Sequence, residues 1–221
     1  MIAQTLRRAT DTIHRHVVAE GAFLLAAAPG FAIVVLLDRS PGNLPLYALG
    51  LVPLGPAFSG IVSTLAHPDD DLAPWRRYWH SYRQNVGDVL RVWIPVLAVC
   101  VVLGSNIAFG AEAGVDGFFL AASSLLLAAT ALFSCHAIVL ASLFRFRTRD
   151  TARLALYYLA ARPLATLGAL SFLVLGMAVI ALVSDWAFAL LASVLGALLV
   201  SSSRSMVGDA TTRFTPEGAD Q

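Results

Sequence analysis

The sequence predicts an all-α protein, a polytopic membrane helical bundle of about six transmembrane helices. The 221 residues are 58% hydrophobic and only 13% charged, whereas a soluble domain carries about 25% charged residues. Six stretches almost free of charge are long enough to cross a bilayer, which takes about 17–25 helical residues. The connectors between these stretches alternate between arginine-rich and arginine-poor.

The six predicted spans follow one another in order. They cover residues 17–37, 44–66, 93–110, 117–144, 163–184 and 186–203. The fourth is long enough to tilt in the bilayer or to extend beyond it. The spans and their connectors form a single membrane domain, residues 1–204. The polar residues 205–221 are expected to be a disordered cytoplasmic tail.

The arginines predict the orientation. All 15 basic residues are arginines, and 14 of them fall in the N-terminal segment, the 67–92 connector, the 145–162 connector and the tail. Positive charge is retained on the cytoplasmic side of a membrane. We therefore expect a multi-pass protein of the cell (plasma) membrane with both termini in the cytoplasm. A net charge of +1 gives no basic field, so no nucleic-acid partner is expected.

Each pair of spans is preceded by a basic amphipathic segment: 1–16, 74–92 and 150–162. The chain thus reads as three units of a surface helix and a transmembrane hairpin. In the second segment, four aromatic residues follow the i, i+3, i+4, i+7 spacing of one helical face. Such a helix either braces the bundle at the membrane surface or docks onto a cytoplasmic partner. The candidate partner-docking residues are Trp75, Arg76, Tyr78, Trp79, Tyr82 and Arg83.

Two spans contain residues that interrupt helices. Pro29 and Gly30 lie near the centre of the first, and Pro53, Gly55 and Pro56 lie near the middle of the second. Proline removes a backbone donor, and in lipid the freed carbonyls need another partner. Interrupted helices line the sites of many transporters; the alternative is a packing kink, where small residues let helices approach closely.

Two polar residues lie deep in other spans: Asn106 in the third and His136 in the fourth. Such groups are costly in lipid unless they are partnered. A hydrogen bond from His136 to Ser134, Asn106 or a freed carbonyl is one interpretation, and a proton- or substrate-linked role is the other. The candidate substrate path comprises Pro29, Gly30, Pro53, Gly55, Pro56, Asn106 and His136.

Glu20 lies about one turn inside the first span. It is expected to form an ion pair at the interface, for example with an arginine of 74–92. The stretch Ala26–Ala28 imitates a signal-peptide cleavage site. However, Glu20 and the charges before it interrupt the apolar core that such a peptide needs, so we expect no cleavage.

The motifs of enzymes are missing from the sequence. It contains no GxSxG, HExxH, Walker A or dinucleotide-binding pattern. No second metal ligand lies at helical spacing from His136, and Cys100 and Cys135 fit small buried hydrophobic residues. The sequence therefore predicts no enzyme activity, no cofactor and no metal site.

Two runs resemble the YesL-like family of bacterial integral membrane proteins. The first is residues 53–60, PLGPAFSG, and the second is residues 75–85, WRRYWHSYRQN. Family members similarly carry a Pro/Gly-Pro-Ala break in an early span and an aromatic helix that leads into the next. The resemblance is best from residue 10 to 95. It implies a context of carbohydrate uptake beside ABC transporters, without a known molecular activity.

Three functions are considered on this basis. The first is an accessory or regulatory component of carbohydrate (ABC-type) transport, whose partner is the transporter permease or ATPase. The second is a small transporter or channel in its own right, and the third is a membrane enzyme. The lipid bilayer is the expected surrounding, and a homo-oligomer is compatible with each of the three.

Overall fold

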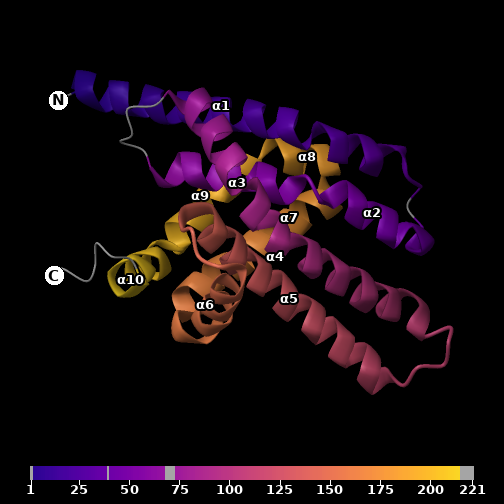
Figure 1. Ribbon diagram of the computed structural model, residues 1–221. Coiled ribbons are helices and arrows are strands. Elements are labelled where there is room, and N and C mark those ends of the chain that lie inside the picture. The colour runs from indigo at the N-terminus through magenta and orange to yellow at the C-terminus, as the bar shows by residue number, and fades with distance from the viewer. Residues whose placement is uncertain (1, 39, 68–72, 215–221) are drawn as a thin grey trace.

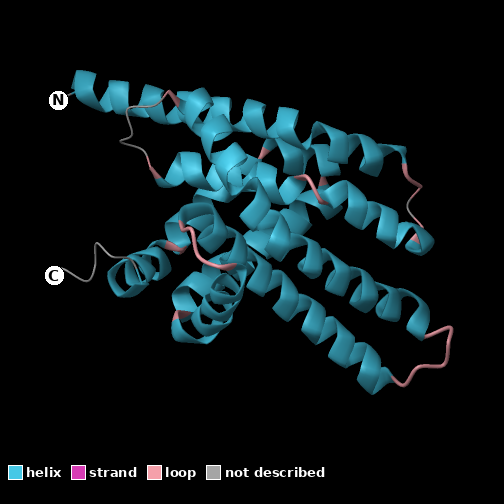
Figure 2. Ribbon diagram, viewed as in Figure 1, coloured by secondary structure: helices cyan, strands magenta, loops and turns pink. Residues whose placement is uncertain are grey.

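The computed structural model describes residues 2–38, 40–67 and 73–214, and this part of the chain consists of helices and short connectors without a strand (Figures 1 and 2). The all-α class is thus confirmed. The first helix, α1, runs without interruption from Ile2 to Leu36. It joins the predicted surface segment 1–16 to the first span. The prediction that Pro29 and Gly30 break this span is wrong, because one missing donor removes a single bond of the helical ladder and neighbouring helices support the turn.

The second predicted span is interrupted, as its prolines indicate. It consists of a 3-10 turn, η1 (Pro41–Asn43), and two helices, α2 (Leu44–Leu51) and α3 (Leu54–Ala66). The α2 segment and α3 meet at an angle of 44°. Neither Pro53 nor Pro56 has a backbone N–H, so the helical ladder lacks two donors at this bend.

The third predicted span belongs to a much longer helix. Residues 74–92 and 93–110 form one helix of 37 residues, α4 (Pro74–Gly110), which begins with proline in its first turn. At 1.5 Å per residue, α4 is about 55 Å long and exceeds the ~30 Å hydrocarbon core. It forms a hairpin with α5 (Gly117–Leu143). Gly114, at φ 71°, makes the turn between them with a backbone conformation that favours glycine.

The C-terminal part differs most from prediction. An amphipathic helix, α6 (Thr148–Ala161), leads into the fifth predicted span, α7 (Pro163–Leu182). The sixth predicted span is divided into α8 (Asp185–Leu190) and α9 (Ala192–Ser202). Beyond it lies α10 (Arg204–Phe214). The expected disordered tail is therefore helical up to Phe214, because Met206 and Ala210 bury an apolar face of α10; residues 215–221 lie outside the described part of the chain.

Among the described residues, four helices can cross a membrane by length and composition: α1 from Thr10, α4, α5 and α7. The bent pair α2–α3 would make a fifth span. The predicted six spans are not confirmed, because neither α8 nor α9 is long enough alone. Large apolar side chains on these helices face outward, including Phe118, Leu125 and Leu164, which are 73%, 73% and 76% exposed. Such an exterior fits a lipid surrounding.

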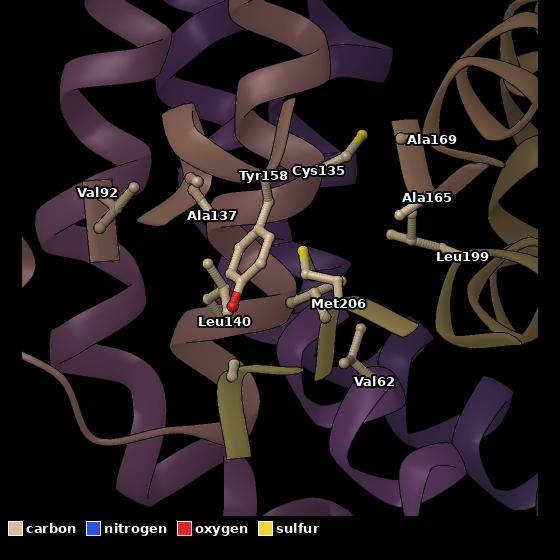
Figure 3. Packing of buried hydrophobic residues seen from close by; sticks show 13 residues of the cluster. Val62, Val92, Cys135, Ala137, Leu140, Tyr158, Ala165, Ala169, Leu199 and Met206 are labelled. Carbon is tan, nitrogen blue, oxygen red and sulfur yellow. The ribbon is translucent and has the colours of Figure 1, made fainter. Parts of the chain in front are cut away.

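The buried residues form two clusters. The larger joins α3–α7, α9 and α10 through small and aliphatic residues around Tyr158, with Val62, Leu140, Leu199 and Met206 (Figure 3). The smaller joins α1, α3, α4 and α9 around Phe23, Ile61 and Tyr78. Helices α3, α4 and α9 contribute to both clusters, so these three helices connect the two parts of the core.

Candidate functional site

The interruption between α2 and α3 is held by a tryptophan. The indole N–H of Trp93 on α4 donates a hydrogen bond to the Leu51 carbonyl oxygen at 2.9 Å. The ring fits because position 55 is glycine: a Cβ there would lie 2.6 Å from the Trp93 ring. The carbonyl at the end of α2 is thereby satisfied inside the protein, as a lipid surrounding requires.

The first span contributes close packing at this break. A Cβ on Gly30 of α1 would collide with the Gly50 carbonyl oxygen of α2. Gly30 is therefore a contact point between two helix backbones, in keeping with the packing interpretation of Pro29–Gly30. The sequence predicted breaks in both spans of this hairpin. The structure has a break in the α2–α3 span, and α1 is continuous.

A second interruption lies where the sequence has neither proline nor glycine. Leu191 separates α8 from α9 and has no side-chain group that can cap a helix. Instead, the Glu20 carboxylate of α1 accepts the backbone N–H of Ser193, in the first turn of α9, at 2.7 Å. A carboxylate at a helix N-terminus satisfies an orphan donor and matches the helix dipole. The sequence predicted an ion pair for Glu20 and did not predict this role as a helix cap.

A partly open apolar cavity of about 220 Å³, here called the central cavity, lies between the two interruptions. One wall comes from α2, α3 and α4, with Leu51, Gly55 and Trp93, and the facing wall includes Phe188 of α8 and Leu199 of α9. Other lining residues are Phe23, Phe58, Ser134, Cys135 and Phe172. The lining is almost wholly hydrocarbon and aromatic, so the cavity suits an apolar group rather than a sugar.

The other predicted path residues lie apart from this cavity lining. Asn106 donates to the Ser123 hydroxyl at 3.2 Å, which joins α4 to α5. His136 is 2% exposed; its Nδ1 lies 3.1 Å from the Leu132 carbonyl oxygen, and its Nε2 lies 3.4 Å from the Thr166 hydroxyl of α7. Both residues are partnered between helices, and the structure does not bring them together. Among the residues of the candidate substrate path, Gly55 lines the central cavity.

The aromatic face of α4 packs inward. Tyr78 is fully buried, donates to the Ala57 carbonyl oxygen at 2.8 Å, and occupies the space left by Gly60, where a Cβ would lie 2.6 Å from its ring. Trp79 and Tyr82 are half-buried and pack edge to face, with ring centroids 5.6 Å apart. This packing matches the bracing interpretation of the segment.

Three of the six predicted docking residues stay accessible. Trp75 is 48% exposed, and Arg76 and Arg83 are exposed. They belong to the half of α4 that precedes the membrane-length apolar stretch. The structure thus divides the six predicted docking residues into two sets. Tyr78, Trp79 and Tyr82 pack against the bundle, whereas Trp75, Arg76 and Arg83 are accessible.

Two polar networks were not predicted. Asn85 of α4 donates to the Ser142 carbonyl oxygen at 2.8 Å, and Ser63 of α3 donates to the same oxygen at 2.9 Å. Together they satisfy a carbonyl near the C-terminus of α5. In the sequence, Asn85 is marked only by its place in the run 75–85, which resembles the YesL-like family.

The second network attaches α10 to the bundle. The Asp209 carboxylate accepts hydrogen bonds from Arg162 at 2.6 Å and Tyr158 at 3.1 Å, and pairs with Arg213 at 2.9 Å. Burial raises the pKa of Asp209, but these hydrogen bonds and the two guanidinium groups outweigh burial and leave it lowered. Burial, and then the contact with Asp209, raise the pKa of Tyr158 to about 12.

Within the described residues, no three His, Cys, Asp or Glu side chains are grouped so as to hold a metal ion. Comparison with protein-family models, with curated proteins and with solved structures finds no match for this chain.

Proposed function

We propose that the chain is an integral protein of the plasma membrane with both termini in the cytoplasm. It acts, without catalysis, as an accessory or regulatory component of a carbohydrate transporter of the ABC type. The carbohydrate context comes from the resemblance to the YesL-like family.

The orientation is supported by the arrangement of the helices. In Figure 1 the N-terminal end of α1 lies on the same side as α6 and α10, and the far end of α1 and the turn between α4 and α5 lie on the opposite side. The arginine-rich segments belong to the first side and the arginine-poor connectors to the second. This agrees with retention of positive charge in the cytoplasm.

The observation that carries the accessory role is the divided surface of α4. Its inner aromatics fasten the helix to α3, and its outer residues Trp75, Arg76 and Arg83 are presented on a rigid support. Aromatic and arginine side chains are the types enriched at protein interfaces. The central cavity, by contrast, has an apolar lining and offers few hydrogen-bonding groups to a polar solute such as a sugar.

The test is affinity purification of the tagged protein from its native membranes in a mild detergent, with mass spectrometry of the bound proteins. We expect an ABC permease or its ATPase in stoichiometric amount. The double variant Arg76→Glu/Arg83→Glu should lose it, whereas Arg149→Glu/Arg153→Glu, which changes the same charge on exposed sites of α6, should keep it. Recovery of the chain alone, or equal loss in both variants, contradicts the proposal.

A second candidate, transport of an apolar solute by the chain itself, is favoured by the cavity between the two interruptions. Filling this space with Gly55→Trp or Cys135→Trp should abolish such transport. Export of an apolar dye from proteoliposomes distinguishes the two candidates, because an accessory component alone moves no dye.

A further inference from the structure

A second hollow lies between the N-terminal half of α1 and the C-terminal end of α9. Its volume is about 400 Å³. Thr12, Arg15 and His16 of α1 form one side, and Ser201 of α9 and Arg204 of α10 form the other. None of these residues has a role in the proposed docking surface or in the central cavity.

The polar lining has the chemistry of an anion site. Two guanidinium groups and an imidazole converge from two different parts of the chain, with two hydroxyl groups beside them. No carboxylate is among the lining residues. The neighbouring acid, Glu20, accepts from the backbone of α9 through one oxygen, Oε2, and its other oxygen, Oε1, is buried without a hydrogen-bond partner among the described residues. Arginine is the side chain best suited to phosphate, which it can contact through two parallel hydrogen bonds.

One polar atom of a residue that lines this hollow lacks a hydrogen-bond partner among the described residues. The Nδ1 atom of His16 is inaccessible to solvent and has no hydrogen-bond partner in the described part of the chain. A buried polar atom without a partner costs free energy. Because Nδ1 is covered by protein, an acceptor oxygen bound between Arg15 and Arg204 satisfies the Nδ1–H tautomer of His16 once the imidazole ring turns towards the hollow.

The remaining wall of the hollow is apolar. Leu65 of α3 and Ala197, Leu198 and Val200 of α9 complete the lining. A ligand that fits both walls carries a phosphate at one end and a hydrocarbon chain at the other. Basic pockets between membrane helices on the cytoplasmic side bind the headgroups of anionic lipids in this way.

We propose that this hollow binds the phosphate of an anionic phospholipid of the cytoplasmic leaflet, held by Arg15 and Arg204 and hydrogen-bonded by His16. The inference rests on the membrane placement in the proposed function, and it is independent of any protein partner. Bound lipid would bridge α1 to the junction of α9 and α10. The lipid thereby holds together helices that are far apart in the sequence.

The experiment uses the purified, delipidated full-length protein in detergent. Phosphatidylglycerol or phosphatidylcholine is added at equal concentration, and native mass spectrometry measures the fraction of protein that retains lipid. We expect phosphatidylglycerol to be retained in preference. One arginine near an anionic lipid surface contributes about a fivefold change in binding, so Arg15→Gln/Arg204→Gln should weaken retention by roughly 25-fold.

Controls separate this site from general charge and from folding. Arg149→Gln/Arg153→Gln removes the same charge and should retain lipid as the wild type does, and Arg15→Lys/Arg204→Lys should retain most of it. Ser201→Glu places a negative charge at an exposed position of the hollow and should also weaken retention. It therefore tests the site even where the arginine variants fail to fold.

Three outcomes overturn the proposal. Equal retention of phosphatidylcholine, which has the same phosphate but no net charge, shows that the site does not select an anionic lipid. Equal loss in the α6 control shows that the hollow is not the site. If inorganic phosphate binds the lipid-free protein and displaces phosphatidylglycerol, the ligand is a soluble phosphate. None of these outcomes bears on the transporter partner, which the purification experiment tests separately.

Discussion

The Glu20 carboxylate accepts the backbone N–H of Ser193 at 2.7 Å, although the two residues are 173 positions apart in the chain. This contact places a charged acceptor from the first helix at the N-terminus of α9. It explains how the chain tolerates an interruption at Leu191, which carries no capping group of its own.

Removal of this cap should destabilise the C-terminal helices. Glu20→Ala leaves the Ser193 N–H without its acceptor, and we expect a loss of about 1–2 kcal/mol in the free energy of unfolding. Glu20→Gln keeps an acceptor oxygen and should lose less. Unfolding by denaturing detergent in mixed micelles measures the difference. A wild-type midpoint for Glu20→Ala would contradict the capping role.

The hydrogen bond from Trp93 to Leu51 should stabilise the break between α2 and α3. Trp93→Phe keeps an aromatic ring but removes the donor, which leaves a carbonyl unsatisfied at a cost of about 1–3 kcal/mol. The matched control is Trp186→Phe, because Trp186 is 56% exposed. Thermal denaturation in detergent should show a lower midpoint for Trp93→Phe alone; equal shifts would refute the argument.

The space above Gly60 should tolerate no side chain. A methyl group there would lie 2.6 Å from the Tyr78 ring, so Gly60→Ala must displace the ring or α3. We expect a loss of about 1–3 kcal/mol. Gly87→Ala, at a helical position with open space around it, should instead be neutral or slightly stabilising. The same unfolding assay compares the two, and similar effects would count against close packing of Tyr78.

The attachment of α10 should depend on pH at both extremes. The pKa of Asp209 is lowered, so its contribution to stability is complete above its ordinary value of 3.8 and is lost as the pH falls through the lower folded-state value. The pKa of Tyr158 is raised from 10.0 to about 12, so its contribution is complete below pH 10.0 and is lost as the pH rises towards 12.

Hydrogen exchange of the α10 amides, corrected for the intrinsic effect of pH, measures this dependence. Asp209→Asn should remove the loss of protection at acid pH. Tyr158→Phe should remove much of the loss at alkaline pH and leave the acid loss in place. If the profiles of wild type and variants coincide at both extremes, Asp209 and Tyr158 do not hold α10 in place.

Part of the candidate site followed from sequence. The prolines at 53 and 56 predicted the break in α2–α3, because the loss of a backbone donor is a property of the residue itself. Pro29 has the same chemistry, yet α1 continues through it. The difference arises because each proline removes one or two bonds, and tertiary packing decides whether a helix bends there.

The sequence by itself determined the helical class, the membrane-length apolar stretches and the separation of arginine-rich from arginine-poor connectors, since these depend on composition and local periodicity. Only the tertiary structure decided that Tyr78 faces inward, that Glu20 caps α9 and that Asp209 fastens α10 to the bundle. Each of these contacts joins residues from different helices. Their existence depends on how helices pack in three dimensions, which no local pattern encodes.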